Sequence, residues 1–314
     1  MAVRRNATHS GRLRGKAATR HLSSVICHPS SGFTLVEMIM VIVITGIIGG
    51  MVAVFLKAPM QQYIDVARRA DMTDVADTAL RRIGRDVRLA LPNSVRVTGA
   101  CGGAGTTCFI EFLPTRGGDR YRAGPETAGA SAGCGSLALD ALDFTAADTC
   151  FEVLGAMPPG LVAGDRVVVY NQGTGTGADA YAGDNTGLYS SNTVATITIN
   201  PGKQFPLASP SSRFQVISTP VSYVCAPALN GIGGTLTRYW NYQIQAAQPA
   251  TVATLTGFAG VQSALLANNV SACNFSYQAN VVAERSGLVT MNLAITNSGE
   301  TVTLYSATHV SNEP

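Results

Sequence analysis

The order of apolar and charged positions divides the N-terminal part of the chain into three segments. Residues 1–32 contain six Lys and Arg residues and no acid, and residues 38–56 contain no charge. A helix with a rise of about 1.5 Å per residue would span about 28 Å over the uncharged run, close to the hydrocarbon core of a bilayer. Because the basic residues come first, the N-terminus is expected to stay in the cytoplasm and the remainder to be exported.

The third segment begins after Pro59, where the pattern becomes amphipathic. Apolar residues at three- and four-residue steps predict one buried helix face, made of Met72, Val75, Ala76, Ala79, Ile83, Val87 and Ala90. On the other face we expect the ion pairs Asp65–Arg69 and Asp77–Arg81, and a solvated cluster of Arg81, Arg82, Arg85 and Arg88. Since Pro92 cannot continue a helix, one helix is predicted from about residue 34 to 91, with its second half packed under a head domain.

Residues 93–314 are predicted to form a β-rich head. The clearest element is a C-terminal hairpin, in which apolar residues alternate from Val289 to Ile295 and again at Val302 and Leu304, around a turn at residues 297–300. Further strands are predicted at residues 165–170, 213–217, 221–225, 235–242 and 273–277. The Gly-, Ala-, Ser- and Thr-rich residues 99–136 and 171–191 are predicted to be long loops.

Six of the seven cysteines lie in this head, namely Cys101, Cys108, Cys134, Cys150, Cys225 and Cys273. An even number in an exported chain indicates disulfides, although buried free thiols are the alternative. Six cysteines allow 15 pairings, and the sequence does not choose among them. Short spacing favours Cys101–Cys108, and Cys134–Cys150 with Cys225–Cys273 complete the working assignment. No metal site is expected, because no C-x2-C spacing occurs and no histidine lies between His28 and His309.

Charge and composition argue against several classes of function. The net charge of +3 belongs to the basic N-terminal segment, so the body has no basic stripe for nucleic acid. His309 is the body's one histidine, so a Ser-His-Asp triad has a single candidate base, and neither catalysis nor a cofactor is expected. The Gly173–Gly177 glycines are expected in a flexible surface loop, and a calcium site at Asp179, Asp184 and Asn185 is the minor alternative. The aromatic residues Tyr239, Trp240 and Tyr242 are expected in the core rather than on a sugar-binding surface.

The entrance of the apolar run carries an acid, Glu37, whose burial in a membrane would be costly. One explanation is local: Thr34-x-x-Glu37 is a capping box, and an acid there favours the helix dipole. The run is too long for an ordinary secretory signal, and residues 55–58 lack the small-x-small cleavage pattern. The apolar segment is therefore expected to remain in the mature protein. Gly46 and Gly50 are expected to allow close helix packing.

A second explanation comes from the wider pattern. The sequence Gly32-Phe33-Thr34-Leu35-Val36-Glu37, between a basic leader and a long apolar helix, resembles the class III signal of type IV prepilins and pseudopilins. The resemblance implies a pilin-like α+β fold, in which a long N-terminal helix packs against a β-rich, disulfide-bonded head. It implies cleavage by prepilin peptidase between Gly32 and Phe33 and N-methylation of Phe33. It also implies that Glu37 neutralises the N-terminal amine of a neighbouring subunit.

The resemblance extends to the minor pilins of mannose-sensitive haemagglutinin (MSHA) type pili. It rests on residues 78–83, 91–96, 239–240, 273–277 and 287–312. The expected organisation is a leader at residues 1–32, a helix at 33–92 with its membrane span at 38–56, and a head at 93–314. The implied partners are other pilin subunits through the N-terminal helix, prepilin peptidase and an inner-membrane assembly platform. The implied location is the bacterial inner membrane with a periplasmic head, and then a pilus or periplasmic fibre.

Three hypotheses follow. The first is a minor pilin that initiates or caps pilus assembly, and the second is a minor pseudopilin of a type II secretion system, similar in size to the J subunit. Neighbouring genes would separate these two. The third is a tip adhesin, which a head that bound no glycan, cells or DNA would exclude.

Overall fold

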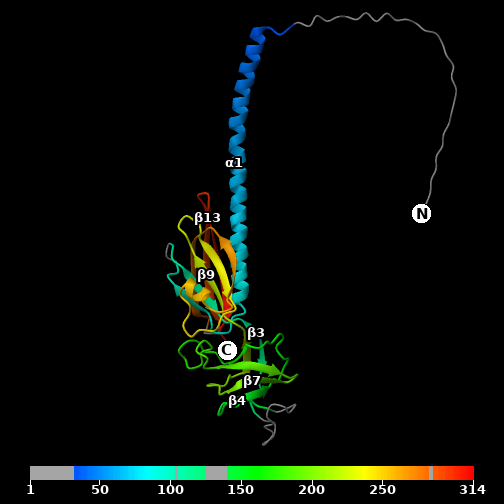
Figure 1. The fold of residues 1–314 in the computed structure, drawn as a ribbon, viewed down its shortest axis with the longest axis vertical. Coiled ribbons are helices and arrows are strands. Elements are labelled where there is room, and N and C mark those ends of the chain that lie inside the picture. Colours follow the sequence, from blue (N-terminus) through cyan, green and yellow to red (C-terminus); the bar gives the residue numbers. More distant parts are fainter. Residues whose placement is uncertain (1–31, 103–104, 125–139, 283–285) are drawn as a thin grey trace, which may run out of the picture. The chain divides into compact units, whose positions relative to one another are not determined.

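The computed structural model describes residues 32–102, 105–124, 140–282 and 286–314 (Figure 1). The chain forms two compact units, Met1–Met60 and Gln61–Pro314. Helix α1 (Leu35–Val87) contributes to both. We call its first part, Leu35–Met60, the stem, and the second unit the head.

Helix α1 has 53 residues and contains Pro59. It ends at Val87, a few residues before the predicted end. The reason is long-range pairing: the amide of Leu91 donates to the carbonyl of Leu113 (2.7 Å), and the amide of Thr115 donates to the carbonyl of Leu89 (2.8 Å). These backbone groups are therefore unable to continue the helix.

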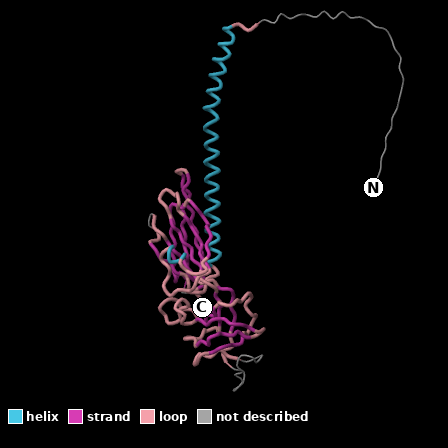
Figure 2. Tube along the Cα trace, viewed as in Figure 1, coloured by secondary structure: helices cyan, strands magenta, loops and turns pink. Residues whose placement is uncertain are grey.

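Two antiparallel sheets accompany α1 in the head (Figure 2). The five-stranded sheet has the order β1-β2-β9-β10-β11. Its strands are β1 (Arg96–Gly99), β2 (Cys108–Phe112), β9 (Val221–Ala226), β10 (Thr235–Trp240) and β11 (Gln262–Asn268). The three-stranded sheet consists of β12 (Val270–Val282), β13 (Ser286–Asn297) and β14 (Glu300–Ser311). The predicted C-terminal hairpin is confirmed as β13–β14, with Ser298 and Gly299 at positive φ in the tight turn.

One hydrophobic core joins these sheets to the second part of α1. It contains helix residues such as Ala76 and Ile83, the inward side chains of β2 and β9, and the predicted apolar face of β13. The predicted buried helix face is correct except at Val75, which is 38% exposed; Leu80 is buried at 3% instead. The outer face of the five-stranded sheet carries a smaller core, which the short helix α2 (Val252–Thr256) covers through Leu255.

A third sheet is inserted between β2 and β9. Its order is β3-β8-β5-β6-β7-β4. Its strands are β3 (Thr115–Arg120), β4 (Asp148–Glu152), β5 (Arg166–Val169), β6 (Thr186–Asn192), β7 (Thr196–Lys203) and β8 (Arg213–Ile217). The edge strands meet through a bridge between Tyr121 and Val153 and through backbone hydrogen bonds beside it. The sheet therefore closes into a small barrel with its own aromatic and aliphatic core.

The strands of the head correct two predicted loops. Residues 99–136 include β2 and β3, and residues 171–191 include most of β6. Strand β2 has the sequence CFIEF and is buried at every position. A strand covered on both faces shows a continuous apolar run rather than alternation, so its short run was hidden between glycine-rich stretches. The strands predicted elsewhere in the head are all present.

Candidate functional site

The start of α1 brings together the residues predicted to be processed. Gly32 and Phe33 lie just outside the helix, and Phe33 is 77% exposed. Thr34 is the N-cap residue: its carbonyl accepts from the amide of Met38 (3.1 Å), and its Oγ1 accepts from the amide of Glu37 (3.3 Å). The capping part of the local explanation is therefore present. Cleavage at Gly32, methylation of Phe33 and the assembly role of Glu37 remain predictions.

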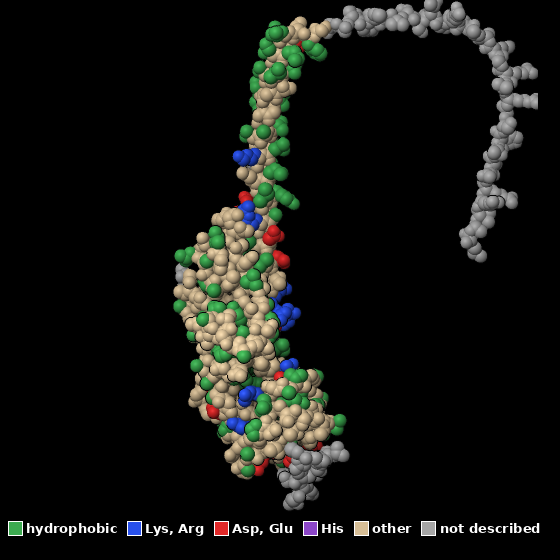
Figure 3. All heavy atoms as spheres, in the orientation of Figure 1, with side chains coloured by type: hydrophobic (Ala, Val, Ile, Leu, Met, Phe, Trp, Pro, Cys, Tyr) green, Lys and Arg blue, Asp and Glu red, His purple; other side chains and the backbone are tan. Residues whose placement is uncertain are grey.

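The stem after this cap is apolar on all sides. From Met38 to Leu56 its large side chains are exposed, most of them by half or more, and Figure 3 shows them along the helix surface. The hydroxyl of Thr45 is satisfied inside the helix by the carbonyl of Val41 (2.6 Å). A helix that is apolar all round suits a membrane or a bundle of like helices. By length and composition α1 qualifies as a membrane-spanning helix, and no other described helix does.

The stem glycines leave open space around them. A Cβ atom added at Gly46, Gly49 or Gly50 would meet nothing within 4 Å. The predicted role of Gly46 and Gly50 in close helix packing therefore concerns partners outside this chain and remains a prediction.

Two of the three predicted disulfides are present, Cys101–Cys108 and Cys225–Cys273. The first links the loop after β1 to the start of β2. The second links the five-stranded sheet to the three-stranded sheet through residues 48 positions apart in the sequence. Cys150 is also disulfide-bonded, but its predicted partner Cys134 lies outside the described residues.

The second part of α1 is fixed to the five-stranded sheet of the head by Asp86, a residue that the sequence pattern did not indicate. Its carboxylate accepts from the hydroxyl of Tyr223 (2.7 Å) and from Nε of Arg238 (2.9 Å), and it forms an ion pair with Arg82 (3.3 Å). Burial, followed by the nearby Asp86 carboxylate, raises the pKa of Tyr223 far above its usual value. Asp86 therefore joins the helix to both β9 and β10.

The surface ion pairs of α1 differ in part from the prediction. Asp77–Arg81 is present at 2.6 Å. Arg69 does not pair with Asp65; its guanidinium donates twice to Glu300, at 3.1 and 3.0 Å, so it reaches the β13–β14 turn. Asp65 pairs with Arg68 instead (3.2 Å). The geometry of the bidentate pair explains the change, since two charge-assisted hydrogen bonds replace a single contact along the helix.

The sequence also did not predict a second network of buried polar side chains, which is centred on Glu111. Glu111 is fully buried in β2, and its carboxylate accepts from Nε of Arg96 (2.7 Å) and from the hydroxyl of Tyr242 (2.8 Å). Burial raises the pKa of Glu111, although Arg96 opposes the rise. The guanidinium of Arg96 also lies 3.5 Å from the ring centre of Tyr181. The one signal in the sequence was an acid inside the apolar run of β2.

The glycine-rich segment predicted as a surface loop is exposed at residues 174–177, and the residues that follow it pack into the head. Gly173, Gly175 and Gly177 have positive φ, but Ala180 and Tyr181, which follow them, are buried. The hydroxyl of Tyr181 donates to the carbonyl of Ser94 (2.9 Å), which fixes this segment beside the chain leaving α1.

The minor alternative of a calcium site in that loop gains no support. Asp179 is buried and accepts from the amide of Tyr181 (2.9 Å). The side-chain amide of Asn185 donates to the carbonyl of Val169 (3.2 Å). Within the described residues, no group of three or more His, Cys, Asp and Glu side chains is placed to hold a metal ion.

The aromatic group of β10 lies largely in the core, as expected. Tyr239 and Tyr242 are buried, and the ring of Tyr242 stacks on Phe258 with ring centres 5.5 Å apart. Trp240 is partly buried against the main core, and the Arg238 guanidinium lies 4.8 Å from its ring centre.

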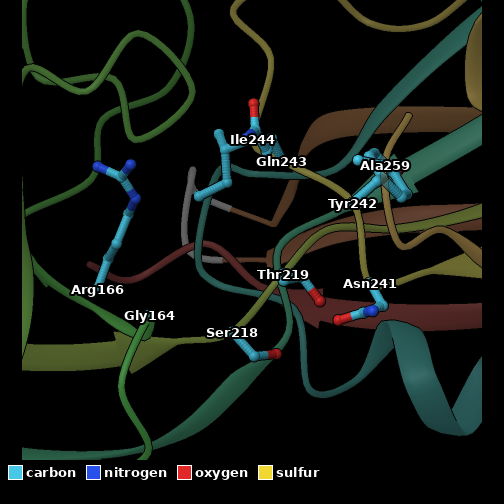
Figure 4. Close-up of a pocket in the computed structure, with 9 residues that line it drawn as sticks. All are labelled: Gly164, Arg166, Ser218, Thr219, Asn241, Tyr242, Gln243, Ile244 and Ala259. Carbon is cyan, nitrogen blue, oxygen red and sulfur yellow. The ribbon is translucent and has the colours of Figure 1, made fainter. Parts of the chain in front are cut away.

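A polar cleft lies where the barrel meets the five-stranded sheet (Figure 4). Its volume is about 460 Å³. It is lined by Gly164, Arg166, Ser218, Thr219, Asn241, Tyr242, Gln243, Ile244 and Ala259. The barrel supplies Gly164 and Arg166, and the connections after β8, β10 and α2 supply the others.

Comparison with known proteins identifies a family motif in the N-terminal segment. Residues 27–53 match the family model of the prokaryotic N-terminal methylation motif. No curated protein and no solved structure matches the chain. The matched segment contains Gly32, Phe33 and Glu37 and most of the uncharged run. The motif and the apolar helix that follows it support a membrane-anchored type IV pilin or pseudopilin, processed by prepilin peptidase and assembled with other pilins.

Proposed function

We propose that this protein is a minor type IV pilin of an MSHA-like pilus, with a role like that of the minor pilin MshO. In this role it is cut between Gly32 and Phe33, methylated on Phe33, held in the bacterial inner membrane by the stem, and incorporated into the fibre to initiate or cap its assembly. The role is structural rather than catalytic. An inner-membrane assembly platform and neighbouring pilin subunits are its partners.

One observation carries the proposal. The exposed apolar stem begins directly after the Gly32–Phe33 position and contains a single acid, Glu37, in its first turn. No described residue of the chain covers this surface, so lipid or other helices must supply the cover. An unpaired carboxylate in such surroundings is unfavourable, and an ammonium partner offsets that cost. The N-terminal amine created by cleavage in a neighbouring subunit is such a partner.

The orientation follows from charge. The basic residues of segment 1–32 precede the stem, and this placement favours a cytoplasmic N-terminus. The head, with its disulfides, would then lie in the periplasm, where disulfides persist.

Mass spectrometry of the mature N-terminus tests the proposal. We expect a chain that begins at Phe33 and carries one methyl group. Gly32→Ser should slow processing, whereas Gly46→Ser, a matched change within the stem, should leave the cleavage rate unchanged. A mature product that begins after Leu56, or normal release of Phe33 from Gly32→Ser, would contradict the proposed processing.

A further inference from the structure

The cleft between the barrel and the five-stranded sheet contains a charge without a counter-charge. Arg166 begins β5 and is half-buried, and its guanidinium has one polar partner, Oγ1 of Thr186 at 3.4 Å. None of the nine described residues that line the cleft is acidic. The nearest carboxylate in sequence, Asp165, pairs with Arg116 at 2.9 Å. A partly buried guanidinium with no carboxylate partner among the described residues is unusual, because buried charges are normally paired.

Groups suited to hydroxyl recognition line the same cleft as this arginine. Figure 4 shows the side-chain oxygens of Ser218, Thr219 and Asn241 on one side of the cleft and Arg166 on the other. The amide nitrogen of Asn241 donates to the carbonyl of Gly260 (2.7 Å), which holds its oxygen in place. Gln243 adds another side-chain amide to the lining. The main chain at Asn241 is left-handed, with φ of 62°, so this position is fixed by a tight turn.

The size of the cleft indicates the size of the ligand. Its volume of about 460 Å³ lies in the range of small-molecule sites and exceeds what a single inorganic anion fills. Ile244 and Ala259 supply apolar surface beside the polar groups. A ligand that matches all of these features carries one negative group, several hydroxyls and an apolar ring face.

We propose that this cleft binds an acidic saccharide, with Arg166 holding the carboxylate and Ser218, Thr219, Asn241 and Gln243 binding ring hydroxyls. The proposal gives the head a ligand class and does not depend on how the stem is processed or assembled. It therefore stands or falls separately from the proposed pilin function.

The test uses the full chain in detergent and three probes of known chemistry. These are a galacturonate hexasaccharide, a neutral galactose hexasaccharide and inorganic sulfate, with binding measured by titration calorimetry. We expect the galacturonate probe to bind with a dissociation constant of about 1 mM or tighter. The neutral probe should bind at least about 10-fold more weakly, since it lacks the charge-assisted hydrogen bonds. Sulfate should compete only weakly, since it cannot reach the hydroxyl-binding groups.

Two variants and one control locate the site. Arg166→Gln should weaken galacturonate binding about 10-fold or more, and Ala259→Trp should block it by filling the cleft while leaving the charge in place. Arg213→Gln removes an exposed arginine of the same barrel that does not line the cleft, and it should bind as the parent does. The thermal midpoint of each variant shows that it is folded.

Three results would overturn the proposal: equal binding of the neutral and acidic hexasaccharides, competition by sulfate as strong as by the hexasaccharide, or unchanged binding by both Arg166→Gln and Ala259→Trp. Absence of galacturonate binding at about 10 mM would also overturn it.

Discussion

The stem and the second part of α1 share one helical backbone but present opposite surfaces. In the stem, apolar side chains are exposed around the whole circumference. In the part from Met72 to Val87, the apolar side chains follow one face and, apart from Val75, are buried in the head core. The difference between them shows that apolar content alone does not tell whether the rest of the chain or an external environment buries the apolar side chains of a helix. The angular distribution of apolar residues does, because a one-sided stripe matches one sheet whereas an all-round surface needs surroundings on every side.

Shortening a buried isoleucine of α1 should destabilise the head more than shortening an exposed one, and this is the strongest of the predicted changes. Ile83 is fully buried and Ile47 is 55% exposed, although both are isoleucines of α1. Ile83→Ala should lower the free energy of unfolding of the head by about 2–5 kcal/mol, because it leaves a cavity in the core. Ile47→Ala should leave that free energy unchanged. Urea unfolding followed by tryptophan fluorescence from Trp240 measures both; a similar loss in the two variants would break the comparison.

Substitution of the acids Asp86 and Glu37 should affect different properties of the protein. Asp86 has three donors within the head, whereas no described side chain pairs with the carboxylate of Glu37, whose backbone amide donates to Thr34. Asp86→Asn should destabilise the head by about 2–3 kcal/mol, because it leaves Arg238 without its carboxylate. Glu37→Ala should not change head stability or membrane insertion, but it should strongly reduce incorporation into fibres.

Membrane fractions and sheared fibres, compared by immunoblot, separate these outcomes. The exposed acid Asp74 offers the control Asp74→Ala, which should change neither stability nor incorporation. Normal incorporation of Glu37→Ala would contradict the role proposed for this acid.

A buried acid in the barrel adds a pH dependence that the stem cannot show, since the stem buries none of its described side chains. Burial, and then the neighbouring carboxylates of Asp148 and Glu152, raise the pKa of Asp140 to about 6. Between about pH 4 and 6 the folded head therefore holds a proton that the unfolded chain releases, so stability should fall as pH rises through this window. The expected loss is about 1–3 kcal/mol. Asp140→Asn should remove it, and an unchanged slope in that variant would show that Asp140 is not its source.

The smallest predicted change in stability comes from replacing a glycine of α1 by alanine, which we compare at Gly84 and Gly46. A Cβ at Gly84 would lie 2.9 Å from Oγ1 of Thr308, whereas a Cβ at Gly46 would meet nothing within 4 Å. Gly84→Ala should destabilise the head by about 1 kcal/mol, because the crowding exceeds the gain in helix propensity. Gly46→Ala should leave the free energy of unfolding unchanged in the same urea unfolding experiment, and stabilisation by Gly84→Ala would show that Thr308 can move aside.

Much of the fold could be predicted where the signal is local. The hairpin β13–β14 followed from alternation on both sides of a tight turn, and the buried face of α1 followed from its three- and four-residue steps. Strand β2 could not be found in this way, because burial on both faces removes alternation. The end of α1 was also missed, since it depends on pairing with residues 113–115, which no pattern near residue 90 reveals.

The candidate sites show the same division. The capping residue Thr34 and the uncharged run after it are contiguous, so the membrane-type stem and its processing motif can be recognised from neighbouring residues alone. Asp86, Glu111 and the cleft around Arg166 depend on side chains that lie far apart in the chain. These contacts become visible in the folded protein, because the partner of a buried charge is set by how the sheets and the helix pack. The spacing of residues along the chain does not contain that information.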